Sequence, residues 1–245
     1  MSISLTTDRS RFVALTAIFA AMSVVADLIL IPSAGIWDSA IFILSPLAGV
    51  LLGPFAGAVA IGLGSLVGHY IFFRDIYEMV FMIGAPFGAA MAGLIYQRRW
   101  KPALGVYSLL LLGYFLEPVT WILPLWGIWD ILAGFCLLVI FSLINIRNLW
   151  PENENSQTLL GLLFATIIGL ESDILLRVFI LVPGQTYWFF YGFDAGVLQA
   201  IWLAAGILTP LKVAIATIVA MIVGLPLLRQ FRAQLGQNAT LTLED

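Results

Sequence analysis

The sequence predicts an all-α, polytopic membrane protein, with one domain (1–245) built as a bundle of about 6–8 transmembrane helices. The composition is the first reason. Hydrophobic residues make up 62% of the chain and charged residues only 10%, and the mean hydropathy is +1.04. Soluble domains average about 25% charged residues, so this chain has too few polar side chains to cover a water-facing globule. The second reason is that apolar stretches of roughly 20 residues, enough to cross ~30 Å of hydrocarbon, recur along the chain.

Composition also excludes several functional classes. The chain has 11 Lys and Arg against 14 Asp and Glu, which leaves no basic surface for nucleic acid. One cysteine, Cys136, excludes an internal disulfide and any cysteine-based metal cluster. One histidine, His69, argues against a histidine-rich metal site. We therefore expect no metal and no cofactor.

Eight apolar segments follow one another along the chain. They are 12–31, 39–53, 54–73, 77–97, 103–123, 128–148, 158–183 and a long 196–228 that is interrupted by Thr209-Pro210. Several boundaries carry helix-ending residues, such as Gly53-Pro54, Lys101-Pro102 and Pro183-Gly184. The only clearly polar linker is 147–157.

The basic residues predict the orientation. They precede the first segment and follow the fourth, the sixth and the last: Arg9, Arg11, Arg98, Arg99, Lys101, Arg147, Arg229 and Arg232. Because Lys and Arg favour cytoplasmic loops, we expect both termini inside, with 1–11, 147–157 and 229–245 cytoplasmic. If 196–208 and 210–228 both spanned, the C-terminus would face outward. We therefore expect 196–208 to be a short outer or re-entrant piece, or the start of one long broken helix.

Small residues recur at four-residue spacing, which places them on one helix face and lets helices approach closely in a membrane. Examples are Gly64 with Gly68 and Gly84 with Gly88. Packing within the bundle explains most of them. Ala17 and Ala21 form a smooth stripe on the first segment that another subunit could use.

Aromatic and ionisable side chains gather at the predicted outer ends of the helices. An aromatic belt and loop solvation explain part of this pattern, but they do not account for so many carboxylates on one side. We interpret the outer half as a substrate site, although a lone interfacial histidine is often a packing residue. The candidate contacts here are His69, Glu117, Trp121, Trp129, Asp130, Tyr187 and Trp188.

Charged residues also lie inside the apolar segment 158–183. Asp173 and Arg177 are four residues apart, acid first, which suits an intrahelical ion pair. Glu171 points to another face and needs a different partner or a ligand. Two interpretations stay open: an ion pair that locks two helices together, or a substrate-orienting cluster of Glu171, Asp173 and Arg177 at the floor of an outward pocket.

Several segments resemble the membrane-embedded S components of energy-coupling-factor (ECF) transporters, the substrate-capture subunits of vitamin and micronutrient importers. The likeness covers most of the chain and consists of a similar pattern of small residues and Gly-Pro breaks. It is carried by 14–21, by 45–57 (SPLAGVLLGPFAG), by 64–68, by 88–99 (GAAMAGLIYQRR) and by 222–229.

The resemblance implies a multi-pass protein of a bacterial or archaeal cytoplasmic membrane. Such a subunit binds a small nutrient from outside with high affinity, then docks on a T component coupled to two cytoplasmic ATPases and releases the cargo inward. In that family an A-x-x-x-A face of the first helix contacts the T component, and Ala17 and Ala21 match its spacing. The chain has no G-x-x-x-x-G-K-[ST] motif, in agreement with that division of labour.

Other classes compete with this interpretation. Asp173-x-x-x-Arg177 is reminiscent of a helix of CAAX-type intramembrane proteases, but the histidines such enzymes need are missing, so we expect no enzyme. An accessory subunit or a stand-alone carrier stays open. The predicted outer-half acids outnumber the bases, which favours a flat, neutral or cationic nutrient. The acids are Asp38, Asp75, Glu78, Glu117, Asp130, Glu171, Asp173 and Asp194, and the bases are Arg74 and Arg177.

Overall fold

The computed structural model describes residues 2–31, 38–73 and 78–241, without the side chains of 2–9, 11, 30–31, 38 and 231–241. The helices are α1 (Ser2–Leu28), α2 (Ile41–Leu52), α3 (Pro54–Ile71), α4 (Glu78–Phe81), α5 (Gly84–Tyr96), α6 (Trp100–Leu116), α7 (Trp129–Ile146), α8 (Glu154–Leu181), α9 (Thr186–Phe189) and α10 (Ala195–Leu241). Two 3-10 turns, η1 (Pro118–Ile122) and η2 (Leu125–Ile128), join α6 to α7. Two short antiparallel strands, β1 (Leu30–Ile31) and β2 (Asp38–Ser39), join α1 to α2.

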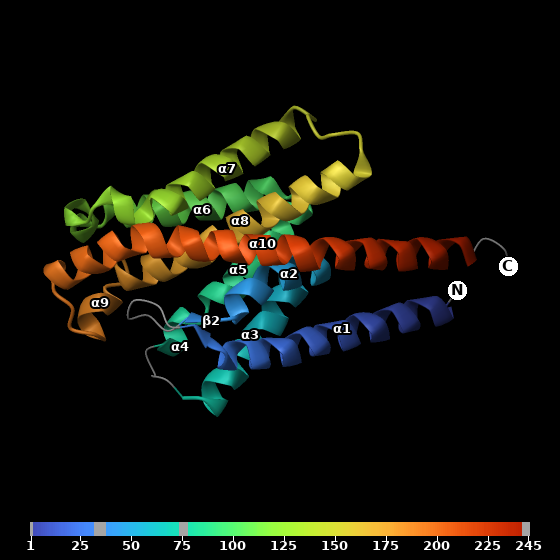
Figure 1. Cartoon of the computed structure of the whole chain (residues 1–245), viewed down its shortest axis with the longest axis horizontal. Coiled ribbons are helices and arrows are strands. Elements are labelled where there is room, and N and C mark those ends of the chain that lie inside the picture. Colours follow the sequence, from blue (N-terminus) through green and yellow to red (C-terminus); the bar gives the residue numbers. More distant parts are fainter. Residues whose placement is uncertain (1, 32–37, 74–77, 242–245) are drawn as a thin grey trace.

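The prediction of an all-α polytopic membrane protein is confirmed. Among the described residues, five helical stretches are long and apolar enough to cross a membrane: Pro54–Ile71, Glu78–Tyr96, Leu125–Ile146, Glu154–Leu181 and Ala195–Gln230. Three shorter apolar helices, Phe12–Leu28, Ile41–Leu52 and Trp100–Leu116, complete the bundle. The long helices lie roughly along one direction, and the helix ends that carry the two termini lie at the same end of the molecule (Figure 1). That arrangement agrees with both termini facing one side of the membrane.

Two predicted spans are shorter than expected. Helix α2 has 12 residues, which is about 18 Å at the α-helical rise and less than the ~30 Å hydrocarbon thickness. It ends at Gly53, whose φ of 84° lies outside the helical region, and Pro54 then begins α3. The segment predicted at 103–123 is helical only to Leu116, because Pro118 cannot donate to the helix and the chain continues as η1.

The last apolar segment is one uninterrupted helix, α10, of 47 residues. The expectation of a short outer or re-entrant piece at 196–208 is therefore wrong. The alternative, the start of one long broken helix, is right that 196–208 belongs to a long helix, but that helix is not broken at Thr209-Pro210. The helix continues past 229 to Leu241, so the predicted tail begins as helix. The predicted polar linker at 147–157 is also shorter, because Asn153 accepts a hydrogen bond from the Asn155 backbone N–H and starts α8 there.

Glycines form the close seams of the bundle. A side chain at Gly49 on α2 would overlap the Ala89 carbonyl of α5. A Cβ at Gly88 on α5 would lie 2.9 Å from the Gly169 carbonyl oxygen of α8. The predicted small-residue faces therefore do pack helix against helix, and α5 lies between α2 and α8 at backbone contact. Helix α7 packs on α8, and α10 packs on both α2 and α8.

Candidate functional site

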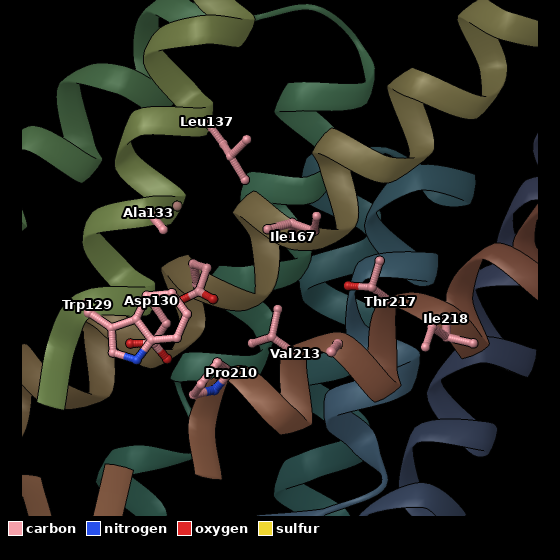
Figure 2. Close-up of a pocket in the computed structure, with 12 residues that line it drawn as sticks. Trp129, Asp130, Ala133, Leu137, Ile167, Pro210, Val213, Thr217 and Ile218 are labelled. Carbon is pink, nitrogen blue, oxygen red and sulfur yellow. The ribbon is translucent and has the colours of Figure 1, made fainter. Parts of the chain in front are cut away.

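A cavity of about 350 Å³ lies between α7, α8 and α10 (Figure 2). Residues at helical spacing contribute one face of each helix, and most of the walls are apolar. The lining residues are Trp129, Asp130, Ala133, Gly134 and Leu137 from α7, Ile167 and Glu171 from α8, and Pro210, Val213, Ala214, Thr217 and Ile218 from α10. Its volume falls in the range of pockets that hold small organic ligands.

Pro210 fixes one edge of this cavity. A proline within a helix has no N–H for the carbonyl four residues earlier, which here belongs to Gly206. The indole N–H of Trp129 donates to that carbonyl oxygen at 2.7 Å. The hydrogen bond that α10 loses at Pro210 is thus replaced by one from α7, which explains why the helix runs on unbroken and why α7 meets α10 at this level.

Asp130 is held beside this junction. Its Oδ1 accepts from the Ile131 backbone N–H at 3.0 Å, and its Oδ2 is hydrogen-bonded to the Thr209 hydroxyl. The single hydroxyl proton of Thr209 is shared between Asp130 Oδ2 and the Ala205 carbonyl oxygen, which lies 2.8 Å from the Thr209 Oγ1. The carboxyl group is buried and sits in the first turn of α7, where the N-terminal end of the helix dipole favours negative charge.

Glu171 supplies the second carboxyl group of the cavity. Its side chain is 3% exposed, and its Oε2 has no hydrogen-bond partner in the described part of the chain. Gly134 makes room for it, because a Cβ there would lie 2.8 Å from both Cβ and Cγ of Glu171. Thr217 is also buried with an unpartnered hydroxyl oxygen. The cavity therefore holds polar atoms without internal partners, which is typical of groups that meet a ligand.

Asp173 and Arg177 lie on a different side of α8. Arg177 Nε donates to Asp173 Oδ1 at 2.6 Å, and the Asp173 side chain is fully buried. The pair packs against α5 at Gly84, where a side chain would overlap both partners. Neither residue lines the cavity. The structure thus separates the predicted cluster, with Glu171 toward the cavity and the ion pair at the α5–α8 seam.

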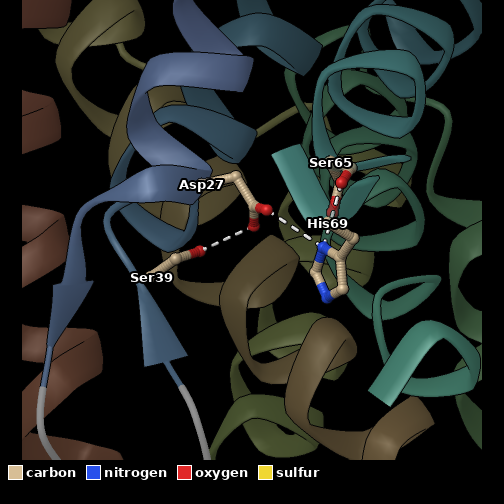
Figure 3. Close-up of polar contacts among 4 residues, drawn as sticks. All are labelled: Asp27, Ser39, Ser65 and His69. Atoms are coloured by element: carbon tan, nitrogen blue, oxygen red, sulfur yellow. Dashed lines mark hydrogen bonds and ion pairs between the residues drawn. The ribbon is translucent and has the colours of Figure 1, made fainter. Parts of the chain in front are cut away.

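His69 belongs to a third polar group, at the ends of α1 and α3 (Figure 3). Its Nδ1 lies 2.9 Å from Asp27 Oδ2 and 2.9 Å from the Ser65 carbonyl oxygen. Ser39 of β2 donates to Asp27 Oδ1 at 3.1 Å. Because the serine hydroxyl faces the aspartate and not the histidine, these residues do not form a nucleophilic triad. They tie α1, α3 and β2 together.

The remaining predicted contacts lie outside the cavity. Glu117 ends α6, and Trp121 on η1 is 72% exposed and donates to the Phe115 carbonyl oxygen. Tyr187 and Trp188 lie on α9, and Trp188 is exposed. Of the predicted substrate contacts, Trp129, Asp130 and Glu171 are the ones brought together.

Some sequence predictions fall outside the described residues. These are Arg74 and Asp75, and the side chain of Asp38. On α1, Ala17 and Ala21 are exposed, on the face opposite to the buried Phe19 and Ser23. That face is open to lipid or to another protein.

Sequence reasoning missed several residues of these groups. Asp27 is an acid inside an apolar segment, a signal that generally marks a paired or functional residue. Pro210 was interpreted as a break, but the indole of Trp129 donates to the Gly206 carbonyl that the proline leaves free, and no sequence pattern links residues 77 positions apart. Thr217 and Gly134 carry no signal, since single Thr and Gly residues are common in membrane helices.

In the described parts of the chain, no group of three or more His, Cys, Asp or Glu side chains is placed to hold a metal ion. Comparison of the chain with protein-family models, with curated proteins and with solved structures finds no match.

Proposed function

We propose that this protein is the substrate-capture subunit of an ECF-type importer and that the α7–α8–α10 cavity takes a small water-soluble nutrient. The observation that carries the proposal is the buried Glu171 carboxyl, which faces the cavity with an unpartnered oxygen. Leaving such a group without a partner in a membrane protein is costly, so it usually marks a substrate or ion site.

The division of labour in such an importer supports the same proposal. The sequence carries no nucleotide-binding motif, so energy has to come from other subunits. The exposed face of α1 with Ala17 and Ala21 offers a smooth apolar surface for a T component. In this proposal two cytoplasmic ATPases complete the complex, and the protein resides in the cytoplasmic membrane of a bacterium or archaeon.

The test is native mass spectrometry of the protein extracted mildly from its own host. We expect a bound molecule of a few hundred daltons on the isolated subunit, and co-purification with a T component and an ATPase pair when these are co-expressed. Ala17→Leu with Ala21→Leu is expected to abolish that co-purification and to leave the bound molecule in place. A subunit that never associates with an ATPase pair contradicts the importer role.

A further inference from the structure

The cavity carries acidic groups and no basic one. Asp130 and Glu171 are its ionisable lining residues. Of the basic residues on α8 and α10 whose side chains the structure describes, which are Arg177, Lys212 and Arg229, none lines it. A ligand that brings positive charge would supply the partner that the buried Glu171 Oε2 lacks.

The walls distinguish an organic cation from a metal ion. Hard metal ions need several oxygen ligands in a small cage. Here the oxygens are the two carboxyl groups and the Thr217 hydroxyl, set in a space of about 350 Å³ with mostly apolar walls. The Trp129 indole lies at the same end of the cavity as Asp130 (Figure 2), and an aromatic ring there suits a weakly hydrated organic cation.

We propose that the cavity binds an organic cation, with its positively charged nitrogen against Glu171 and its apolar part along Val213, Ala214 and Leu137. This inference rests on the proposed function and narrows it to one substrate class. Asp130 is already engaged by Thr209 and Ile131, so it adds charge but Glu171 provides the direct contact.

The first test is the identity of the molecule that co-purifies with the full chain, read by native mass spectrometry. A molecule with a permanent or protonated nitrogen cation supports the inference, and a neutral or anionic molecule overturns it. Glu171→Gln is expected to weaken retention of that molecule about 100-fold. Glu152→Gln, which removes an exposed carboxylate on the loop between α7 and α8, is the matched control and is expected to retain it.

If the protein purifies without a bound molecule, its melting temperature in the presence of added organic cations tests the inference instead. Choline, tetramethylammonium and N-methylpyridinium are added as chloride salts, against sodium chloride and against 3,3-dimethylbutan-1-ol, a neutral molecule shaped like choline. A rise in Tm with at least one organic cation, retained in Glu152→Gln and lost in Glu171→Gln, supports the inference. Equal stabilisation by sodium or by the neutral alcohol, or no stabilisation by any organic cation, overturns it.

Two further results separate this inference from the proposed function. Glu171→Asp keeps the carboxylate and is expected to recover part of the binding that Glu171→Gln loses. A variant that lost binding only because it was misfolded would show no such recovery. If the chain binds an organic cation but never joins an ATPase pair, the result supports the cation site and contradicts the importer role. If a complete importer binds a neutral nutrient, the result supports the importer role and contradicts the cation site.

Discussion

Glu171 and Asp173 are buried acids two residues apart on α8, but they face opposite neighbours. Asp173 lies at the seam with α5, where Gly84 admits it and Arg177 neutralises it at 2.6 Å. Glu171 lies against Gly134 of α7 and opens into a cavity whose lining holds no basic residue. Residues i and i+2 of a helix point in nearly opposite directions, so one short sequence serves two environments. In the proposed function, Asp173 holds the fold together and Glu171 contacts the ligand.

The largest expected effect is on stability at the seam. Arg177→Gln leaves a fully buried carboxylate without its cation, and we expect the free energy of unfolding to fall by about 3 kcal/mol. Unfolding in mixed detergent micelles measures this. Glu171→Gln is expected to leave the stability of the empty protein unchanged or higher, because it removes a carboxyl that has no cation beside it. Equal destabilisation by both variants would contradict the contrast between the two acids.

Ligand affinity provides the converse test. Glu171→Gln is expected to weaken binding of the co-purifying molecule by about 100-fold, or ~2.8 kcal/mol, because it removes the charged contact. Asp173→Asn, on the other side of the same helix, is expected to change the affinity by less than about threefold. Titration calorimetry on both variants measures the two values. A larger loss with Asp173→Asn would assign the substrate contact to the seam instead.

Added side-chain volume between α5 and α8 also tests the packing of this seam. A side chain at Gly84 would overlap Asp173 and Arg177, so we expect Gly84→Ala to lower the free energy of unfolding by about 2 kcal/mol. Gly105 on α6 is the matched control, because a Cβ there meets no atom within 4 Å. Thermal melting of the two variants compares them. Similar melting temperatures would mean that the α5–α8 seam is not tightly packed.

The smallest expected effect concerns the edge of the cavity. Trp129→Phe leaves the Gly206 carbonyl without the donor that replaces the N–H absent at Pro210, at a cost of about 1 kcal/mol. Pro210→Ala supplies a backbone N–H for that carbonyl. In the Pro210→Ala protein, Trp129→Phe is therefore expected to lower the free energy of unfolding by less. A double-mutant cycle in unfolding free energy measures the coupling. Additive effects would show that the indole does not replace the missing hydrogen bond.

Much of the fold followed from local patterns in the sequence. Hydropathy located the apolar helices, and the four-residue spacing of small residues located faces such as Gly84 with Gly88 that pack at backbone contact. The ion pair of Asp173 and Arg177 was also predicted, because residues four apart meet on one helix. These features depend on neighbours within one helix, which sequence spacing reveals.

Features that depend on contacts between helices were harder to predict. Thr209-Pro210 was expected to interrupt the last segment, but the Trp129 indole satisfies the carbonyl that the proline leaves free, and the helix continues. The candidate site was predicted as a broad outer cluster, and the structure brings only Trp129, Asp130 and Glu171 of that set into one cavity. Which face of α8 meets α7 and which meets α5 is decided by the shapes of three helices together, and one sequence does not carry that information.

The most direct test of the central claim is an experimentally determined structure of the wild-type protein with its co-purified molecule. We predict density between α7, α8 and α10, with a cationic nitrogen about 3 Å from the Glu171 carboxylate. Density among Tyr187, Trp188 and the exposed end around α9, or a molecule that contacts Asp173 and Arg177 while the cavity beside Glu171 stays occupied by lipid alone, would contradict the account.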